Sequence, residues 1–343
     1  MHFIHRNLST RLSSSRKSMA GVTLIELMVA VAISGFLMIG AITVFMQSRT
    51  TFRVTESLSR LQENARFAID SIEPDIRMAH YWGLTPRTYL IVGRRAPNEA
   101  AGIGAHTCGN NWNLNLNEAV EGTNNTYSWA CAAFGTAAAG SDTLIVRRAG
   151  EDAITGAGAL TANTLYIQST RSQLGQLFAG ATVPGGYTTT TSETHRLVVN
   201  GYYVDTTSSV PGMPSLRRKV LGTGGAITDE EVIVGVEDMQ VQFGIDTDVP
   251  GTPVAPNPNR GAVDRYVNTD AAIIDPTNAA FNPNAEILAV RIWLLLRAER
   301  FEAGLIDPTD YEYADRDFGT FTDGIRRVLV SKTIYIRNAR PPL

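Results

Sequence analysis

The amino-acid sequence predicts an α+β protein: one long N-terminal α-helix, with its first half in a membrane, packed on an antiparallel β-sheet head with long loops. Three observations lead to this fold class. Leu27 to Phe45 is a run of 19 residues without a charge, which as a helix is long enough to cross the hydrocarbon core of a bilayer. An apolar stripe with helical spacing follows that run, and beyond residue 83 the chain changes to short β-rich runs.

The segment before the apolar run has the composition of a membrane-targeting leader. The first 21 residues contain Arg6, Arg11, Arg16 and Lys17 and no acidic residue. A basic, acid-free segment followed by an apolar run is typical of membrane targeting, and the positive-inside rule places the basic side in the cytoplasm. No small-x-small cleavage site follows the run, so we expect the apolar segment to stay on the protein as its anchor.

The apolar stripe predicts that the helix continues well past the membrane. Its members recur every three or four residues, which describes one face of a helix. They are Val54, Leu58, Leu61, Ala65, Ala68 or Ile69, Ile72 and Ile76. A continuous helix from Val22 to about His80 would be roughly 90 Å long, with a kink or interruption expected at Pro74. The predicted divisions are a leader at 1–21, a helix at 22–82 (transmembrane 22–46, amphipathic stem 47–82) and a β-rich head at 83–343.

The head contains seven runs with the alternation or β-branched content of strands. These runs are 88–93, 142–148, 163–168, 195–204, 231–246, 286–300 and 326–338. Within 231–246 the alternation changes phase at Glu237-Asp238, which indicates a β-bulge. The stretches 96–141 and 247–283 are expected to be loops.

Charge and motifs argue against catalysis and against nucleic-acid binding. Removing the four leader bases from the 30 basic residues leaves 26 against 33 acidic residues, or −7. An acidic body is a poor match for a phosphate backbone. There is no P-loop, GxSxG or HExxH motif, so we do not expect the protein to be an enzyme or to bind a cofactor or a metal. The acidic stretch Asp307–Asp317 lacks EF-hand spacing, and we interpret it as a solvated loop rather than a Ca²⁺ site.

Cys108 and Cys131 lie in one loop-rich stretch. They are either two unpaired buried thiols or, in an oxidising compartment, a disulfide, which is the reading that we favour. On the chain-entropy account such a bond would contribute roughly 3 kcal/mol.

One carboxylate, Glu26, stands at the edge of the apolar run. The stretch Gly21-Val22-Thr23-Leu24-Ile25-Glu26 resembles the processing site of type IV prepilins and pseudopilins. The resemblance implies that a dedicated membrane peptidase cuts between Gly21 and Val22 and that the new amino terminus is methylated. Phenylalanine is the usual first mature residue in that class, so Val22 departs from the pattern.

Glu26 then suggests a role in assembly. An ionised carboxylate in hydrocarbon costs several kcal/mol unless it has a partner. The resemblance implies that the partner is the Val22 amine of a neighbouring subunit, in a salt bridge that forms only when subunits pack in register. The alternative is a carboxylate held at the headgroup level in contact with water.

Four blocks give a narrower resemblance, which is to the PilW family of minor pilins. They are "LQENARFAIDSIEPDIRMAHYWG", "GVEDMQVQFGIDTD", "AVRIWLLLRAER" and "TIYIRNAR". The resemblance implies a pilin-like fold, an inner-membrane protein with a periplasmic head, and a subunit that helps start a type IV pilus at or near its tip. The implied partners are other minor pilins, the major pilin, the prepilin peptidase and a large tip adhesin.

Three other functions stay open from the sequence. A type II secretion pseudopilin of the J class shares the processing site and the helix. A pilin for DNA uptake or surface binding would use its loops, although the acidic balance disfavours DNA. A tethered periplasmic enzyme would need a cleft with converging side chains, which the sequence does not suggest.

Overall fold

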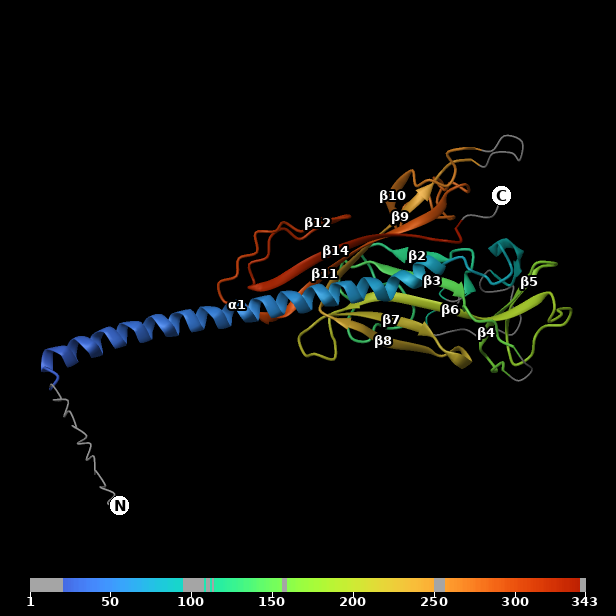
Figure 1. The fold of residues 1–343 in the computed structure, drawn as a ribbon. Helices are drawn as coiled ribbons and strands as arrows, with labels where there is room; N and C mark the ends of the chain where they lie inside the picture. The colour runs from blue at the N-terminus through green and yellow to red at the C-terminus, as the bar shows by residue number, and fades with distance from the viewer. Residues whose placement is uncertain are drawn as a thin grey trace, which may run out of the picture. The chain divides into compact units, whose positions relative to one another are not determined.

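The computed structural model describes residues 21–94, 108, 112, 114–155, 159–249 and 257–339, so the leader at 1–20 lies outside the described residues. The chain divides into two compact units, one containing the described residues up to Glu56 and the other those from Ser57 onward. Figure 1 shows the elements.

A single helix, α1, runs from Leu24 to Met78. At 1.5 Å per residue its 55 residues span about 80 Å. The expectation of one continuous helix is therefore confirmed, with both ends slightly inside the predicted limits. Pro74 lies within the last two turns, and the helix continues past it to Met78. His80 follows with a positive φ of 63°, a backbone conformation that stops a helix.

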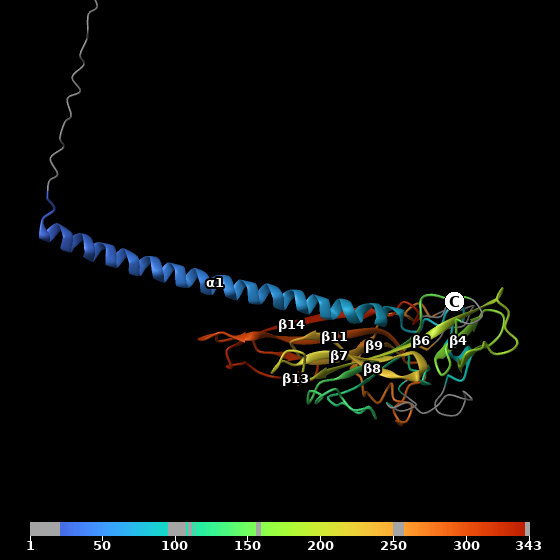
Figure 2. The ribbon, with the colours of Figure 1, turned by 90° about the horizontal axis from the view of Figure 1, so that it is seen from below.

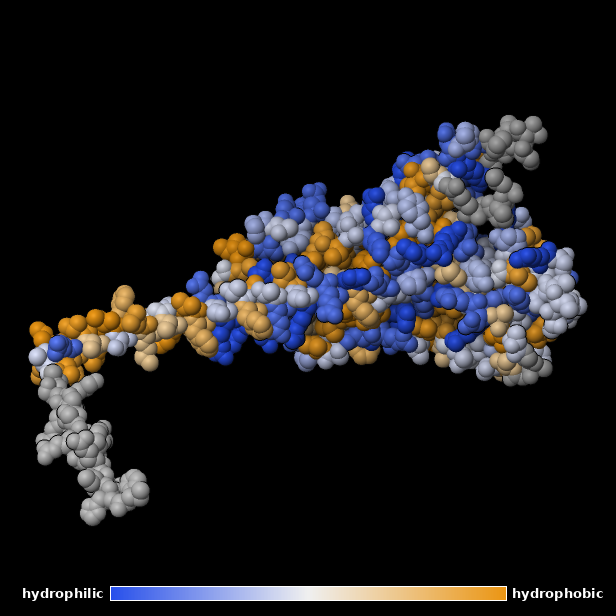
Figure 3. Space-filling model, viewed as in Figure 1, coloured by the Kyte–Doolittle hydropathy of each residue, from blue (hydrophilic) through white to orange (hydrophobic). Residues whose placement is uncertain are grey.

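The amphipathic stripe of α1 is buried in the larger unit. The buried helix residues are Leu61, Ala65, Ala68, Ile69, Ile72, Asp75 and Ile76, and all but Asp75 were predicted from their spacing. Upstream, the residues from 22 to 53 are exposed, and Figure 3 shows hydrophobic side chains covering this part of α1. The second half of the helix thus has its apolar stripe buried in the larger unit, whereas the apolar side chains of the first half are left exposed.

The strands in the described part of the head form three sheets. Their bounds are β1 Ile91–Val92, β2 Val120–Thr123, β3 Thr143–Ala149, β4 Leu165–Thr170, β5 Gly175–Ala179, β6 Ser192–Asp205, β7 Ser215–Leu221, β8 Ile227–Val234, β9 Val236–Asp246, β10 Arg265–Asn268, β11 Glu286–Phe301, β12 Glu312–Tyr313, β13 Arg316–Asp317 and β14 Ile325–Tyr335. Thr88–Leu90 and Thr223–Gly225 are short 3₁₀ turns.

The largest sheet has eight strands, in the order β1-β5-β4-β6-β3-β2, with β7 added to β6 and β8 added to β7. Its long strand β6 pairs with β4 through Ser192–Arg196 and then with β3 and β7 through Leu197–Asp205. The second sheet has the order β10-β9-β11-β14, and β12 and β13 form a small hairpin. All pairings are antiparallel except β1 with β5.

The structure corrects the sequence prediction at three places. Both predicted loops contain a strand of four residues, β2 in one and β10 in the other, because pairing with β3 and β9 stabilises segments too short to show the alternation of a strand by themselves. The run at 231–246 is two strands in two sheets, since Gly235 with a φ of 97° separates β8 from β9. Half of 88–93, Thr88–Leu90, is a 3₁₀ turn, and only Ile91–Val92 is a strand.

The predicted bulge is confirmed. Asp238 pairs with Leu295 and Val236 with Leu296, so Glu237 is the extra residue on β9.

The end of α1 packs where the two large sheets meet. One core cluster contains the buried helix residues together with side chains from both sheets. On one side Lys332 of β14 donates to Glu73 at 2.5 Å, and the Arg337 amide donates to the Arg77 carbonyl. On the other side Asp75 reaches strands β3 and β6. Figure 2 shows this part of α1 along β11 and β14.

A buried carboxylate also joins the two sheets. Asp142 precedes β3 and is only 1% exposed. Its carboxylate accepts the Asn125 amide at 2.7 Å and the Val241 amide of β9 at 2.8 Å. Burial raises the pKa of Asp142 to about 7, and the nearby Asp315 and Asp238 carboxylates also raise it.

Candidate functional site

The proposed cleavage point lies in exposed, non-helical backbone. Gly21, Val22 and Thr23 precede the first helical residue and are exposed. A Cβ placed on Gly21 would have no atom within 4 Å. A peptidase therefore has access to the Gly21–Val22 bond in an exposed, non-helical segment, which is the condition that favours proteolysis.

Glu26 is held at the start of the helix by Thr23. Its Oε2 atom accepts the Thr23 amide and the Thr23 hydroxyl, both at 2.9 Å, while the Thr23 hydroxyl oxygen accepts the Glu26 amide at 3.3 Å. This reciprocal arrangement is a capping box, with Thr23 at the N-cap and Glu26 three residues later. Sequence reasoning missed it, although the Thr-x-x-Glu spacing was available as a signal.

The capping box defines what the Glu26 carboxylate can still bind. Both bonds from Thr23 end on Oε2, so the other carboxylate oxygen keeps its capacity to accept a donor from another molecule. Val22 is still joined to Gly21 and has no free amine in the uncut chain. The structure therefore places Glu26 and Val22 at the same end of α1 without testing the intermolecular salt bridge.

The apolar part of α1 meets the requirements of a membrane span. Among the described residues, α1 is the one helix long and apolar enough to cross a bilayer, and its apolar window is unburied. Within it the Thr43 hydroxyl donates to the carbonyls of Ile39 at 2.6 Å and Gly40 at 3.1 Å. Such internal bonds remove the cost of a free hydroxyl in hydrocarbon.

A buried polar cluster fixes the other end of the helix to the head. The carboxylate of Asp75 accepts hydrogen bonds from Arg148 at 3.1 Å, Asn200 at 2.5 Å and the Tyr202 hydroxyl at 2.6 Å. The side chains of Asp75 and Arg148 are 8% and 14% exposed. This cluster was not predicted. An acidic residue beside Ile72 and Ile76 on the buried stripe was its only sequence signal.

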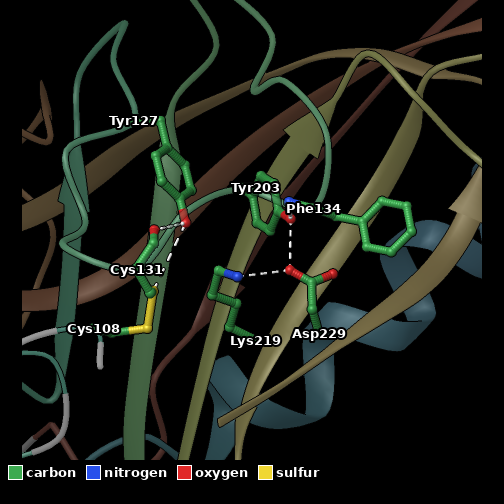
Figure 4. The surroundings of a disulfide bond; sticks show 7 residues. All are labelled: Cys108, Tyr127, Cys131, Phe134, Tyr203, Lys219 and Asp229. Atoms are coloured by element: carbon green, nitrogen blue, oxygen red, sulfur yellow. Dashed lines mark hydrogen bonds and ion pairs between the residues drawn. A yellow bond between two sulfur atoms is a disulfide. The ribbon is translucent and has the colours of Figure 1, made fainter. Parts of the chain in front are cut away.

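The two cysteines are joined in the structure. A disulfide links Cys108 to Cys131, and Figure 4 shows its surroundings. The Tyr127 hydroxyl donates to the Cys131 carbonyl at 2.8 Å, and the Tyr127 ring lies 5.1 Å from the ring of Tyr203 on β6. The disulfide thus fastens Cys108 to a segment that packs on the large sheet.

Tyr203 connects that segment to the charged strands β7 and β8. Its hydroxyl donates to Asp229 at 2.6 Å and accepts the Phe134 amide at 2.9 Å, while Lys219 donates to Asp229 at 2.7 Å. Burial raises the pKa of Tyr203 well above its usual value, so this phenol stays a hydrogen-bond donor.

The two histidines that the structure describes, His80 and His195, have surroundings typical of residues with a structural role. His195 is 1% exposed and has a ring nitrogen 2.9 Å from the Gly150 carbonyl and the other 3.3 Å from Glu193. Burial lowers the pKa of His80 to about 4, which keeps it neutral. His2, His5 and His106 lie outside the described residues.

Two acidic groups of the stretch at 307–317 have hydrogen-bond donors within the head. Asp307 accepts the Thr309 amide and the Tyr311 hydroxyl of its own stretch, whereas Asp315 accepts the side-chain amides of Asn124, Asn125 and Asn268 from distant segments.

The carboxylates of Asp246, Asp248 and Asp264 offer ligand atoms within 4.8 Å of one another, a geometry that could hold a cation. Asp246 and Asp264 accept amides of their own loops in the structure.

Two family descriptions match this chain. The prokaryotic N-terminal methylation motif matches residues 16–42, which include Gly21, Val22 and Glu26. The family described as type IV pilus-assembly protein W matches residues 201–338. No curated protein sequence matches. A type IV-like pilin from Thermus thermophilus is similar at 16% identity over 53% of this chain and 87% of that chain, with a TM-score of 0.23, too low to carry any argument.

Proposed function

Since the two family matches make this chain a type IV pilin-like protein with a PilW region and an N-terminal methylation motif, we propose that it is a minor pilin that helps to initiate type IV pilus assembly at or near the pilus tip. In this proposal the prepilin peptidase removes residues 1–21, the inner membrane holds the apolar half of α1, and the head is in the periplasm. A disulfide in the head accords with that oxidising compartment.

The observation that carries the proposal is the geometry at the start of α1. An accessible Gly21–Val22 bond precedes a carboxylate that Thr23 holds at the helix N-terminus. Cleavage would create a Val22 amine about one helical turn before Glu26. Two chains side by side in the membrane then offer an amine and a carboxylate to each other, and pairing compensates both charges in hydrocarbon.

The pairing gives assembly its register. A neighbour shifted along the membrane normal leaves one carboxylate and one amine unpaired, each at a cost of several kcal/mol. Only chains aligned at their N-termini avoid that cost. We propose other minor pilins and the major pilin as these neighbours, with a large adhesin as a further tip partner. No catalytic role and no nucleic-acid partner is proposed.

The second candidate is a pseudopilin of a type II secretion system, of the J class. The N-terminal geometry serves both functions equally. The match of residues 201–338 to a type IV pilus-assembly family favours the pilus.

The test is a strain that lacks this chain, in which surface pili are counted and secreted proteins are assayed together. Loss of pili with normal secretion supports the minor pilin, whereas normal pili with lost secretion would assign the chain to secretion. The strain is then complemented with Glu26→Ala and, as a matched control on the same helix, Glu63→Ala. We expect the Glu26 variant to be processed and membrane-bound but poorly incorporated into pili, and the Glu63 variant to restore pili. Equal restoration by both variants would refute the pairing mechanism.

A further inference from the structure

A cavity of about 650 Å³ lies beside β4 and the start of β6, near the end of the head where Figure 1 labels β4 and β5. Its most buried lining residues are Gln168 on β4 and Ser192 and Thr194 on β6, each less than 9% exposed. Gln168 pairs directly opposite Thr194, so these side chains project from the same face of the sheet. They form the floor of the cavity.

The side chains of the floor are linked by a chain of hydrogen bonds, and some of their acceptor oxygens remain unused. Thr194 donates its hydroxyl hydrogen to Gln168 Oε1 at 2.5 Å, Gln168 Nε2 donates to Ser192 Oγ at 2.9 Å, and Ser192 donates to the Thr188 carbonyl at 2.6 Å. Both hydroxyl hydrogens are therefore committed, while oxygen lone pairs and one N–H of Gln168 remain. A ligand that complements this floor must bring hydroxyl donors.

The walls combine apolar patches with further hydroxyls. Ala153, Ile154 and Leu160 contribute from the segment between β3 and β4, and Ala181 and Val183 from the segment between β5 and β6.

Tyr187 is half-buried in the same wall, and its hydroxyl donates to the Leu174 carbonyl at 2.9 Å. Its ring is thus fixed in place, and rings of this kind pack against C–H groups.

The charge of the cavity selects against ionic ligands. Among the described residues that line it there is no Lys, Arg or His, and the one charged group is Glu193. Glu193 lies between Ser192 and Thr194 on β6, so its side chain projects from the opposite face of the sheet, where its carboxylate is 3.3 Å from His195 Nε2. A phosphate or a carboxylate would therefore find no positive partner among the described residues that line the cavity.

We propose that this cavity binds a neutral saccharide. Such a ligand has hydroxyl donors for the floor, acceptor oxygens for the Gln168 N–H, apolar ring faces for the walls and no net charge. The volume lies within the ordinary range of small-ligand sites. The ligand class goes beyond the assembly role, because none of the cavity residues belongs to α1.

The test uses the full chain in phosphatidylcholine nanodiscs, because many common detergents carry sugar headgroups. Glucose, galactose, mannose and N-acetylglucosamine are titrated by calorimetry and by saturation-transfer NMR, with glucuronate and inorganic phosphate as anionic probes. At least one neutral sugar is expected to bind saturably with a millimolar Kd, and the anions are not. Absence of saturable binding by all four sugars, or equal binding of the anions, would overturn the proposal.

Two variants locate the binding. Ala181→Trp fills the cavity from an exposed position in its wall and should weaken binding by at least about tenfold, whereas Ala303→Trp, at an exposed position outside the cavity, should leave it unchanged. Thr194→Val removes a floor acceptor and should weaken binding by about tenfold. Thermal unfolding of each variant checks the fold. Native-like binding by the Ala181 variant, or an equal loss in the Ala303 variant, would refute the assignment.

Discussion

Replacing Asp75 by alanine should strongly destabilise the head. Its carboxylate is the common acceptor for Arg148 of β3 and for Asn200 and Tyr202 of β6. Alanine would leave the Arg148 guanidinium, only 14% exposed, without this partner. Loss of one member of a buried ion pair costs about 3–5 kcal/mol, so we expect Asp75→Ala to lower the free energy of unfolding by that amount.

The assay is urea unfolding of the full chain in nanodiscs, followed by the tryptophan fluorescence of the four Trp residues, of which Trp82 is buried just beyond α1. Asp70→Ala is the matched control on the same helix. Asp70 is 53% exposed in its pair with Arg66, and such surface pairs contribute less than about 1 kcal/mol.

A double variant separates charge from packing. Asp75→Leu combined with Arg148→Met removes both charges and should recover much of the lost stability, because apolar replacement of a buried ion pair is often neutral. A loss below about 1 kcal/mol for Asp75→Ala, equal to that of the Asp70 variant, would refute the reasoning.

The remaining predictions concern processing, the cysteines and pH. Gly21→Val should block leader removal without disturbing the fold, since a Cβ at Gly21 meets no atom within 4 Å; a mature-sized band on a gel would contradict this. Mass measurement of alkylated protein should show Cys108 and Cys131 becoming reactive together only after reduction, and two alkylated thiols in the native protein would exclude the bond. Because the Asp142 pKa is about 7 in the folded head and the usual value for an aspartate is 3.8, the folded state holds an extra proton between these two pH values. The free energy of unfolding should therefore fall as pH rises through that window, by about 1.4 kcal/mol per pH unit from this group. Urea unfolding from about pH 5 to about pH 8 measures it, and the stability of Asp142→Asn should depend less on pH than that of the native chain. The same pH dependence in both proteins would exclude Asp142 as the cause.

The elements that the sequence predicted well are those whose pattern is local. The apolar run is continuous, the stripe from Leu61 to Ile76 repeats with the helical period, and each member reports on the same element. The bulge at Glu237 was visible because it shifts the alternation of a long strand. Strands β2 and β10 were missed because each has only four residues, too few to show a clear alternation, and pairing with a neighbour makes them strands.

The polar clusters could not be predicted in the same way. Asp75 meets partners 73 and 125 residues away, and no spacing rule connects positions on a helix with positions on two strands. Its charge beside two buried isoleucines showed that something had to compensate it, but not which residues would do so.

The sequence by itself determined the long apolar run, the basic segment before it and the place of Glu26 at the start of the helix, because these depend on the order of neighbouring residues and on the length of an apolar run. The capping box is equally local, since three residues of spacing define it, but it was recognised only in the structure. Only the tertiary structure decided how the chain divides into two large sheets at Gly235, which groups surround Asp75 and Asp142, and that Gln168, Ser192 and Thr194 line one cavity. The physical reason is that strand register and buried hydrogen bonds join residues distant in sequence, and a polar side chain acquires its role from the partners that folding brings to it.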